Sequence, residues 1–186
     1  MTAPAVCVFC SASEDIPAPH VDLAGRTGAA IAARGWTLVS GGERVSMMGA
    51  VARGARARGG TTVGVVPRCL TDRTDPDCDE LVLTDSMAER KSAMIDRSDA
   101  LLALPGGLGT CDELFEAWTT RMLGLHAKPV VVLDPDGHFT ELLRWVDSAV
   151  RSGFIGERSR DALVVARDVD SALDACLPRA RRPVRS

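Results

Sequence analysis

Short apolar runs alternate with helix-like patterns along this chain of 186 residues, and this alternation restricts the fold more than any other feature. Strands are predicted where apolar runs are bounded by turn residues, at residues 6–10, 36–40, 62–67, 81–84, 99–104, 129–133 and 163–166. Helices are predicted between them, at residues 19–34, 46–58, 87–97, 110–123, 139–150 and 169–176. Such an alternation is typical of α/β proteins with a parallel sheet.

Several of the predicted strands are continuous apolar runs, as at residues 129–133, and strands of this kind are covered on both faces. We therefore predict a single Rossmann-like domain over residues 1–178, with a doubly wound, mostly parallel sheet and helices on both faces. The arginine-rich residues 179–186 are predicted to form a disordered tail.

Charge and hydropathy argue against several classes of partner. The net charge is −3, whereas a nucleic-acid-binding protein is normally basic. No apolar run approaches the roughly 20 residues that span a membrane. The N-terminal residues MTAPA lack the basic and apolar regions of a secretory signal. We expect a cytoplasmic protein without nucleic acid or membrane partners.

Cys7 and Cys10 have the CxxC spacing of some zinc and redox sites. They lie inside a predicted strand, however, where side chains three positions apart point to opposite faces. Without a second CxxC pair, these cysteines are predicted to be buried thiols that pack as small apolar groups.

A glycine-rich turn, PGGLGT at residues 105–110, follows an apolar strand and precedes a helix. In open parallel sheets, ligands bind at this end of the strands. Gly106, Gly107 and Gly109 let the backbone approach a ligand, the helix N-terminus offers free N–H groups, and Thr110 adds a hydroxyl. The pattern suits a phosphate group, although a tight turn needed only for packing has the same sequence. It is not a Walker loop, because no lysine follows at the required spacing.

Glu113 lies three residues after Thr110, and this spacing has two interpretations. A threonine that begins a helix and a glutamate three residues later form a capping box. A carboxylate in the first helical turn beside an anion site is also well placed to act in catalysis. The spacing leaves both interpretations open.

The predicted helix at residues 87–97 carries two cations on its apolar face. Met87 and Met94 mark that face, and Arg90 and Lys91 fall on it. A buried charge without a partner is costly, so inward-facing cations need a ligand phosphate or a carboxylate nearby. The alternative is that both side chains reach solvent past the methionines.

Residues 68–80 form the longest irregular segment, which is polar and acidic. A loop of this length in a compact domain is often functional. A lid over a site and a tolerated surface loop are both compatible with the sequence.

The segment at residues 87–133 closely resembles the LONELY GUY family, many members of which carry the older label lysine decarboxylase-like. The family pattern PGGxGTxxE stands here as PGGLGTCDE at residues 105–113, and MxxRK stands as MAERK at residues 87–91. The N-terminal VCVFC followed by SAS, and the turn SGGERVSMMG, are also similar to family segments. The resemblance extends over residues 6–176.

This resemblance implies a cytokinin riboside 5′-monophosphate phosphoribohydrolase, which cleaves the N-glycosidic bond of adenine-type nucleoside 5′-monophosphates to free base and ribose 5-phosphate. Glu113 would stabilise the sugar cation and orient or deprotonate water, and Arg90 would hold the 5′-phosphate or the ribose. Gly106, Gly107, Gly109, Thr110 and, less centrally, Lys91 would bind the phosphate. No metal and no cofactor are expected. The identity of the base, whether adenine, isopentenyladenine or another, stays open.

A second glycine turn departs from the family pattern, which usually reads GGGxxGLMG. Gly41 and Gly42 are retained as candidate phosphate-binding residues, but the third glycine is Glu43 and the fourth is Ser46. A carboxylate at this position would crowd or repel a phosphate. The first glutamate of the usual GTxEE is Asp112, which is one methylene shorter.

The resemblance to this family also implies a homodimer, so a homodimer is expected here. The predicted helix at 110–123 and its end carry Leu114, Trp118 and Leu125 on one stripe, beside Met122. This stripe is broad enough for a core and an interface together, and the pattern does not separate them.

Two rival functions have sequence arguments. A non-catalytic nucleotide or phosphate-ligand carrier fits the altered turn at Glu43, whereas the retained Glu113 favours an enzyme. A decarboxylase would need a lysine Schiff base with pyridoxal phosphate, and neither Lys91 nor Lys128 stands in a recognisable cofactor setting. The chain's three histidines are scattered without metal-ligand spacing and are His20, His126 and His138.

Overall fold

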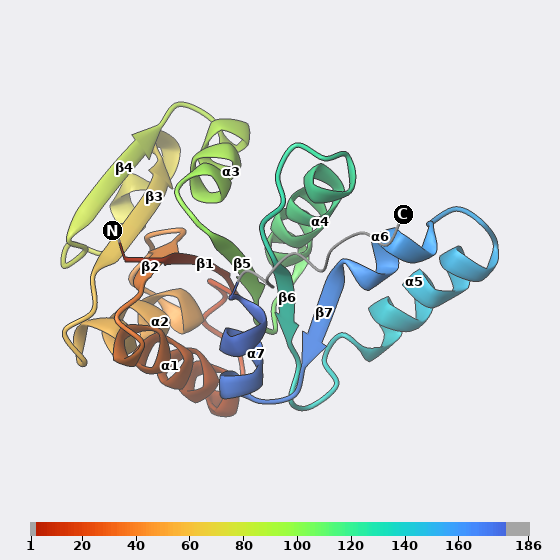
Figure 1. Cartoon of the computed structure of the whole chain (residues 1–186). Coiled ribbons are helices and arrows are strands. Elements are labelled where there is room, and N and C mark those ends of the chain that lie inside the picture. Colours follow the sequence, from red (N-terminus) through yellow and green to blue (C-terminus); the bar gives the residue numbers. More distant parts are fainter. Residues whose placement is uncertain (1–2, 178–186) are drawn as a thin grey trace.

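A single seven-stranded sheet organises the computed structural model, which describes residues 3–177 (Figure 1). The strands lie in the order β4-β3-β2-β1-β5-β6-β7, and every neighbouring pair is parallel. Their bounds are β1 Ala5–Phe9, β2 Thr37–Ser40, β3 Thr62–Pro67, β4 Glu80–Thr84, β5 Ala100–Ala103, β6 Val130–Leu133 and β7 Leu163–Ala166. The predicted tail at 179–186 lies outside the described residues.

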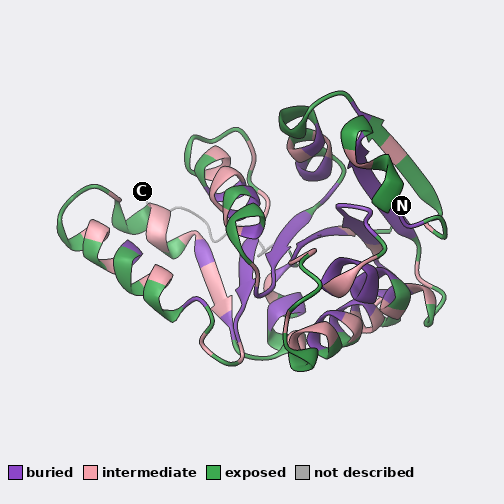
Figure 2. Ribbon diagram, turned by 180° about the vertical axis from the view of Figure 1, so that it is seen from behind, coloured by how far each residue is buried: buried purple, intermediate pink, exposed green. Residues whose placement is uncertain are grey.

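Helices cover both faces of this sheet, as the continuous apolar strands predict. The helices are α1 Ala18–Ala33, α2 Ser46–Arg56, α3 Met87–Asp96, α4 Leu108–Met122, α5 Thr140–Arg151, α6 Glu157–Asp161 and α7 Val169–Ala175. Residues of α1, α2 and α7 pack into the core on one face, and residues of α3, α4 and α5 pack into the core on the other. Figure 2 shows burial concentrated on the central strands and the helix sides that face them.

The central strand β1 contributes to both cores because its side chains alternate between the faces. Val6, Val8 and Cys10 lie on one side, and Cys7 and Phe9 on the other. The two cysteines are free and buried on opposite faces, as predicted. Burial raises the pKa of both thiols, which keeps them neutral.

The order of the strands reverses next to β1. The chain builds β1 to β4 outward in one direction and then places β5 on the other side of β1. This arrangement confirms the predicted doubly wound sheet. In such sheets, the point of reversal opens a crevice outside the carboxyl ends of the strands, which is the usual ligand position.

Three local features differ from the sequence-based prediction. Helix α4 begins at Leu108, two residues early, because Gly107 is its N-cap residue. The short helix α6, Glu157–Asp161, was not expected, since its polar sequence ERSRD has no apolar periodicity. The segment at residues 68–80 contains a 3-10 helix, η1, at Arg68–Arg73. No helix within residues 3–177 has both the length and the apolarity to cross a membrane.

Candidate functional site

A cavity of about 340 Å³ opens at the point where the strand order reverses. It lies at the carboxyl ends of β1, β2 and β5, and helices α2, α3 and α4 and the segment η1 complete its wall. Its lining residues are Cys10, Ser11, Ala12, Ser13, Glu43, Met48, Leu70, Met87, Arg90, Gly107, Leu108, Gly109, Thr110 and Glu113. The volume is within the range of small-molecule sites.

Arg90 and Glu113 form a buried ion pair in this cavity, although they are far apart in the sequence. Arg90 Nη1 donates to Glu113 Oε1 at 3.0 Å, and Arg90 Nε donates to the carbonyl oxygen of Val65 on β3 at 3.1 Å. The relative exposure is 4% for Arg90 and 6% for Glu113. A cation on the inward face of α3 needs an anionic partner, and for Arg90 this partner is the carboxylate of Glu113.

Burial controls the acidity of Glu113. Removal from water raises the pKa of this carboxyl to about 7, although the Arg90 guanidinium acts in the opposite direction. Asp112, a neighbouring carboxylate, adds to the rise. A carboxyl that titrates near neutral pH is suited to taking up or releasing a proton during a reaction.

The capping-box interpretation of Glu113 is wrong. Gly107 is the N-cap of α4, so Thr110 lies inside the first turn and does not begin the helix. No side chain caps this N-terminus. Glu113 lies one turn further along, where its carboxylate contacts Arg90.

The glycine turn at residues 105–110 and the start of α4 form one wall of the cavity. The first backbone bond within α4 runs from Cys111 N–H to the Gly107 carbonyl, so the N–H groups of Leu108, Gly109 and Thr110 have no partner in the helix. Gly107 and Gly109 have no atom close to the position of a β-carbon. These open positions leave the backbone accessible to a ligand at the positive end of the helix dipole.

Gly106 has a different role from its neighbours, because it does not line the cavity. A β-carbon at Gly106 would lie 2.1 Å from the hydroxyl oxygen of Thr110, so the absent side chain lets the buried Thr110 pack against the turn. His138 Nε2 also lies 2.9 Å from the Gly106 carbonyl oxygen. His138 thus supports the turn from the β6–α5 loop, a contact that the scattered histidines did not predict.

The Gly41–Gly42 turn supports the site from behind. A β-carbon at Gly41 would lie 1.9 Å from Arg90 Nη2, so only glycine leaves room for the guanidinium. Gly42 packs against Gly64 and Val66 of β3. Neither Gly41 nor Gly42 lines the cavity, which gives both residues a supporting position relative to Arg90.

Lys91 lies outside the cavity lining, although it is adjacent to Arg90. Its ammonium group forms ion pairs with Asp112 at 3.0 Å and with Glu116. These contacts raise the pKa of Lys91, the hydrogen bond to Glu116 being the larger cause. The ammonium group of Lys91 is therefore paired with two carboxylates of α4, and we do not include Lys91 among the proposed ligand contacts.

The turn after β1, which contains the SAS segment at residues 11–13, and the segment η1 add lining residues that were not among the candidate site residues. Ser11 and Ser13 line the cavity beside the glycine turn after β5, because β1 and β5 are neighbours in the sheet. Ser11 and Ser13 could have been predicted from the rule that ligands bind at the carboxyl ends of parallel strands, because both residues follow β1. Leu70 of η1 also lines the cavity, which places part of the segment 68–80 over the site.

Neither lysine of the chain reaches the cavity. Lys128 donates through its ammonium group to the carbonyl oxygens of Ile95 and Asp96, at the end of α3. Lys91 is held by carboxylates of α4. Within the described residues, no group of three or more histidine, cysteine or acidic side chains is arranged to hold a metal ion.

A parallel doubly wound sheet, with a cavity at its reversal point and a glycine turn that opens a helix there, defines a Rossmann-like protein. The model of the family described as "possible lysine decarboxylase" matches residues 48–176. The chain therefore belongs to this family, the LONELY GUY family.

Relatives with assigned names agree with this assignment. A cytokinin riboside 5′-monophosphate phosphoribohydrolase of Mycobacterium tuberculosis is 53% identical over 175 residues, which cover 93% of each chain. A protein of the same name from Arabidopsis thaliana is 37% identical over 163 residues, which cover 87% of this chain and 76% of the relative. Among solved structures, the molybdenum cofactor carrier protein of Chlamydomonas reinhardtii superposes with a TM-score of 0.72 and 28% identity, covering 94% and 96% of the two chains.

Proposed function

We propose that this protein hydrolyses the N-glycosidic bond of adenine-type nucleoside 5′-monophosphates, including cytokinin riboside monophosphates, to free base and ribose 5-phosphate. The buried Arg90–Glu113 pair beside the open N-terminus of α4 carries this proposal. Relatives that are 53% and 37% identical bear the name of this activity. The cytoplasmic location expected from the N-terminal sequence stays a prediction.

The carboxylate of Glu113 supplies the charge that the reaction needs. Cleavage of an N-glycosidic bond passes through a sugar with positive charge on its anomeric carbon and ring oxygen. An anionic carboxylate beside that carbon stabilises the cation, and it accepts the proton of the attacking water. Burial increases the electrostatic effect because it excludes water from around the carboxylate.

The phosphate end of the substrate fits the start of α4. The N–H groups of Leu108, Gly109 and Thr110, and the Thr110 hydroxyl, are the proposed donors to the phosphate oxygens. Glu113 lies one helical turn beyond Gly109, so a phosphate held at the helix N-terminus would place the attached ribose near the carboxylate. Arg90 would bind the phosphate or the ribose and hold Glu113 in place.

The proposal predicts that the 5′-phosphate is required for turnover. Adenine release from AMP should exceed release from adenosine by at least roughly 10²-fold in kcat/KM, because several N–H donors at a helix N-terminus bind the phosphate in both ground and transition states. Chromatography of the free base, with AMP, adenosine, ATP and isopentenyladenosine monophosphate as substrates, measures this preference. Equal turnover of AMP and adenosine would contradict it.

A carrier of a phosphate-containing ligand is the second candidate function. The solved carrier protein with 28% identity shares the fold, and Glu43 in the cavity departs from the family's glycine turn. Binding without base release would support this function. The buried Arg90–Glu113 pair favours the hydrolase, because a carrier needs no ionisable carboxyl that titrates near neutral pH.

We also propose that the protein forms a homodimer through an apolar groove between α4 and α5. The groove has a volume of about 200 Å³, and Phe115, Trp118, Met122, Trp145 and Phe154 are among its lining residues. In the predicted stripe along α4 and the residues after it, Leu114 and Trp118 are buried in the core, whereas Met122 and Leu125 are exposed. Exposed apolar side chains gathered on one surface are typical of a protein interface.

Phe154→Asp should convert the dimer to a monomer. The side chain of Phe154 is 88% exposed, so the substitution removes apolar contact area between copies and costs the isolated fold little. Light scattering after gel filtration should give about twice the chain mass for the wild type and the chain mass for the variant. Glu157→Lys serves as the control, because Glu157 is exposed and lies outside the groove lining. A monomeric wild type would contradict the proposal.

A further inference from the structure

Glu43 places a carboxylate in the cavity at a position where the LONELY GUY family usually has glycine. It follows the Gly41–Gly42 turn at the end of β2, and it is only 7% exposed. It lines the same cavity as Arg90, Glu113 and the start of α4. A buried carboxylate that faces a ligand cavity requires a reason, because removing its charge from water is costly.

The charge of Glu43 has a partner, but its acceptor capacity is not used. Arg73 Nε of η1 lies 3.0 Å from Glu43 Oε2. This contact lacks hydrogen-bond geometry, and the buried Oε2 atom has no hydrogen-bond donor among the residues that the structure describes. The ion pair therefore compensates the negative charge and leaves lone pairs available for donors. Hydroxyl groups of a ligand are such donors.

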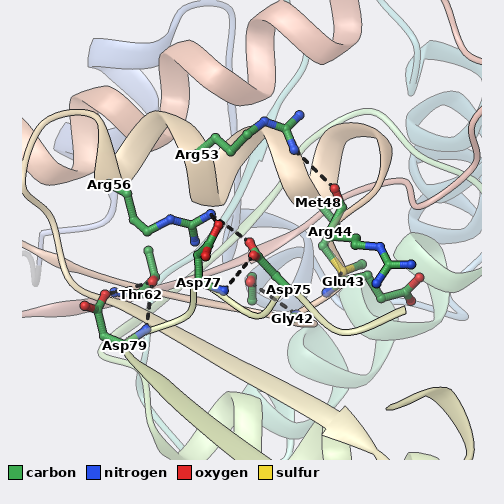
Figure 3. A network of polar contacts seen from close by, with 11 residues as sticks. Gly42, Glu43, Arg44, Met48, Arg53, Arg56, Thr62, Asp75, Asp77 and Asp79 are labelled. Atoms are coloured by element: carbon green, nitrogen blue, oxygen red, sulfur yellow. Dashed lines mark hydrogen bonds and ion pairs between the residues drawn. The ribbon is translucent and has the colours of Figure 1, made fainter. Parts of the chain in front are cut away.

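The carboxylate is not needed to hold the turn in place. Backbone hydrogen bonds connect the turn to the end of η1 and the residues after it: Asp75 N–H donates to the Gly42 carbonyl at 2.8 Å, and Arg44 N–H donates to the Arg73 carbonyl at 3.0 Å. Arg56 also pairs with the buried Asp75 at 3.0 Å (Figure 3). These contacts fix the turn independently of the Glu43 side chain.

The sheet places Glu43 at a suitable distance from the proposed phosphate position. The strand order is β2-β1-β5, so the ends of β2 and β5 are two strand spacings apart, which is roughly 10 Å. A ribose 5-phosphate with hydrogen bonds at both ends spans such a distance. In Rossmann nucleotide-binding proteins, an acidic side chain in this part of the fold binds the ribose hydroxyls.

We propose that Glu43 accepts hydrogen bonds from the 2′- and 3′-hydroxyls of the substrate's ribose and thereby makes this chain selective for ribonucleotides over 2′-deoxyribonucleotides. This inference rests on the proposed nucleoside monophosphate as substrate. It also explains why a carboxylate is tolerated near a phosphate site: the carboxylate faces the hydroxyl end of the sugar, and Arg73 compensates its charge.

The experiment compares AMP with 2′-deoxy-AMP in the wild type, Glu43→Gln and Glu43→Gly. The ratio of kcat/KM for AMP to that for 2′-deoxy-AMP should fall roughly 10-fold or more in Glu43→Gly, because a hydrogen bond to a charged acceptor is lost, and by less in Glu43→Gln. Deoxynucleotides are chemically more labile, but this lability is the same for all variants and cancels in the comparison. Glu14→Gln is the matched control, since Glu14 is the other acidic neighbour of Arg73, at 3.8 Å, and does not line the cavity.

A binding measurement separates this inference from the proposed function. The wild type should bind ribose 5-phosphate roughly 10-fold or more tightly than 2-deoxyribose 5-phosphate in calorimetry, and Glu43→Gly should lose this difference. If the difference depends on Glu43 while AMP is not cleaved, the proposed reaction is wrong and the inference stands. If AMP is cleaved and both ratios are the same in all variants, the inference is wrong. An equal loss of affinity for both sugars would likewise overturn it, because it would mean that Glu43 only holds the cavity wall.

Discussion

Glu113→Gln should fold normally and lose at least roughly 10²-fold in turnover of AMP, the scale expected for removing a general base or a charge-stabilising group. Glutamine has nearly the same shape, and its Oε1 still accepts the hydrogen bond that Arg90 donates to Glu113 Oε1 at 3.0 Å. It lacks the negative charge that a sugar cation requires. Substrate affinity should change little, since the proposed phosphate donors are at the start of α4.

The pH dependence of the same pair of proteins is the control. Burial raises the pKa of Glu113 to about 7, so the carboxyl is protonated and neutral below this pH and anionic above it. If the anion is the active form, kcat/KM of the wild type rises with pH up to about 7 and then levels off. The Glu113→Gln protein should lack this rise. Near-normal turnover, or the same rise in the variant, would remove Glu113 from the site.

Arg90→Ala should lose both activity and stability. Arg90 lies on the inward face of α3, and the structure gives it two buried partners, Glu113 and the Val65 carbonyl. Breaking a buried ion pair costs about 3–5 kcal/mol, and we expect a value of about 3 kcal/mol because the remaining Glu113 can take up a proton. Turnover should fall by roughly 10²-fold or more as the ribose loses its positioning contact.

Arg90→Lys is the matched variant for this prediction. It keeps the positive charge beside Glu113, so most of the stability should return, whereas the planar guanidinium that contacts two partners is lost and activity should stay low. Chemical denaturation measures the free energy of unfolding, and base release measures turnover. An Arg90→Ala protein with unchanged stability would show that the pair does not contribute to folding, and one with full activity would exclude Arg90 from catalysis.

The parallel sheet and its helices were predictable because each element has a local signal. Continuous apolar runs indicate buried strands, and β3 begins and ends at the predicted residues, Thr62–Pro67. The short helix α6 has no such signal, since most of its residues are charged. The start of α4 was misplaced because glycine and threonine both occur at helix N-termini, and only the backbone conformation at Gly107 decides between them.

Features of the site that depend on the pattern within one helix were predictable from the sequence. Contacts between side chains of two different elements were not. The face of α3 indicated an inward Arg90, but neighbouring positions on a helix point in directions about 100° apart, so Lys91 turns towards α4 instead. The pairing of Arg90 with Glu113 and of Arg73 with Glu43 depends on how the chain crosses the sheet. No local pattern records contacts of this kind, and both pairs shape the cavity.

We propose that the Arg90–Glu113 cavity cleaves a nucleoside monophosphate and does not merely hold one. Proton NMR of AMP with the purified protein distinguishes cleavage from binding, because the signals of AMP, adenine and ribose 5-phosphate are separate. With the wild type, AMP should disappear while adenine and ribose 5-phosphate appear in equal amounts, and with Glu113→Gln under the same conditions AMP should stay unchanged. AMP signals that show binding to the wild type but persist without product would contradict the hydrolase and support the carrier.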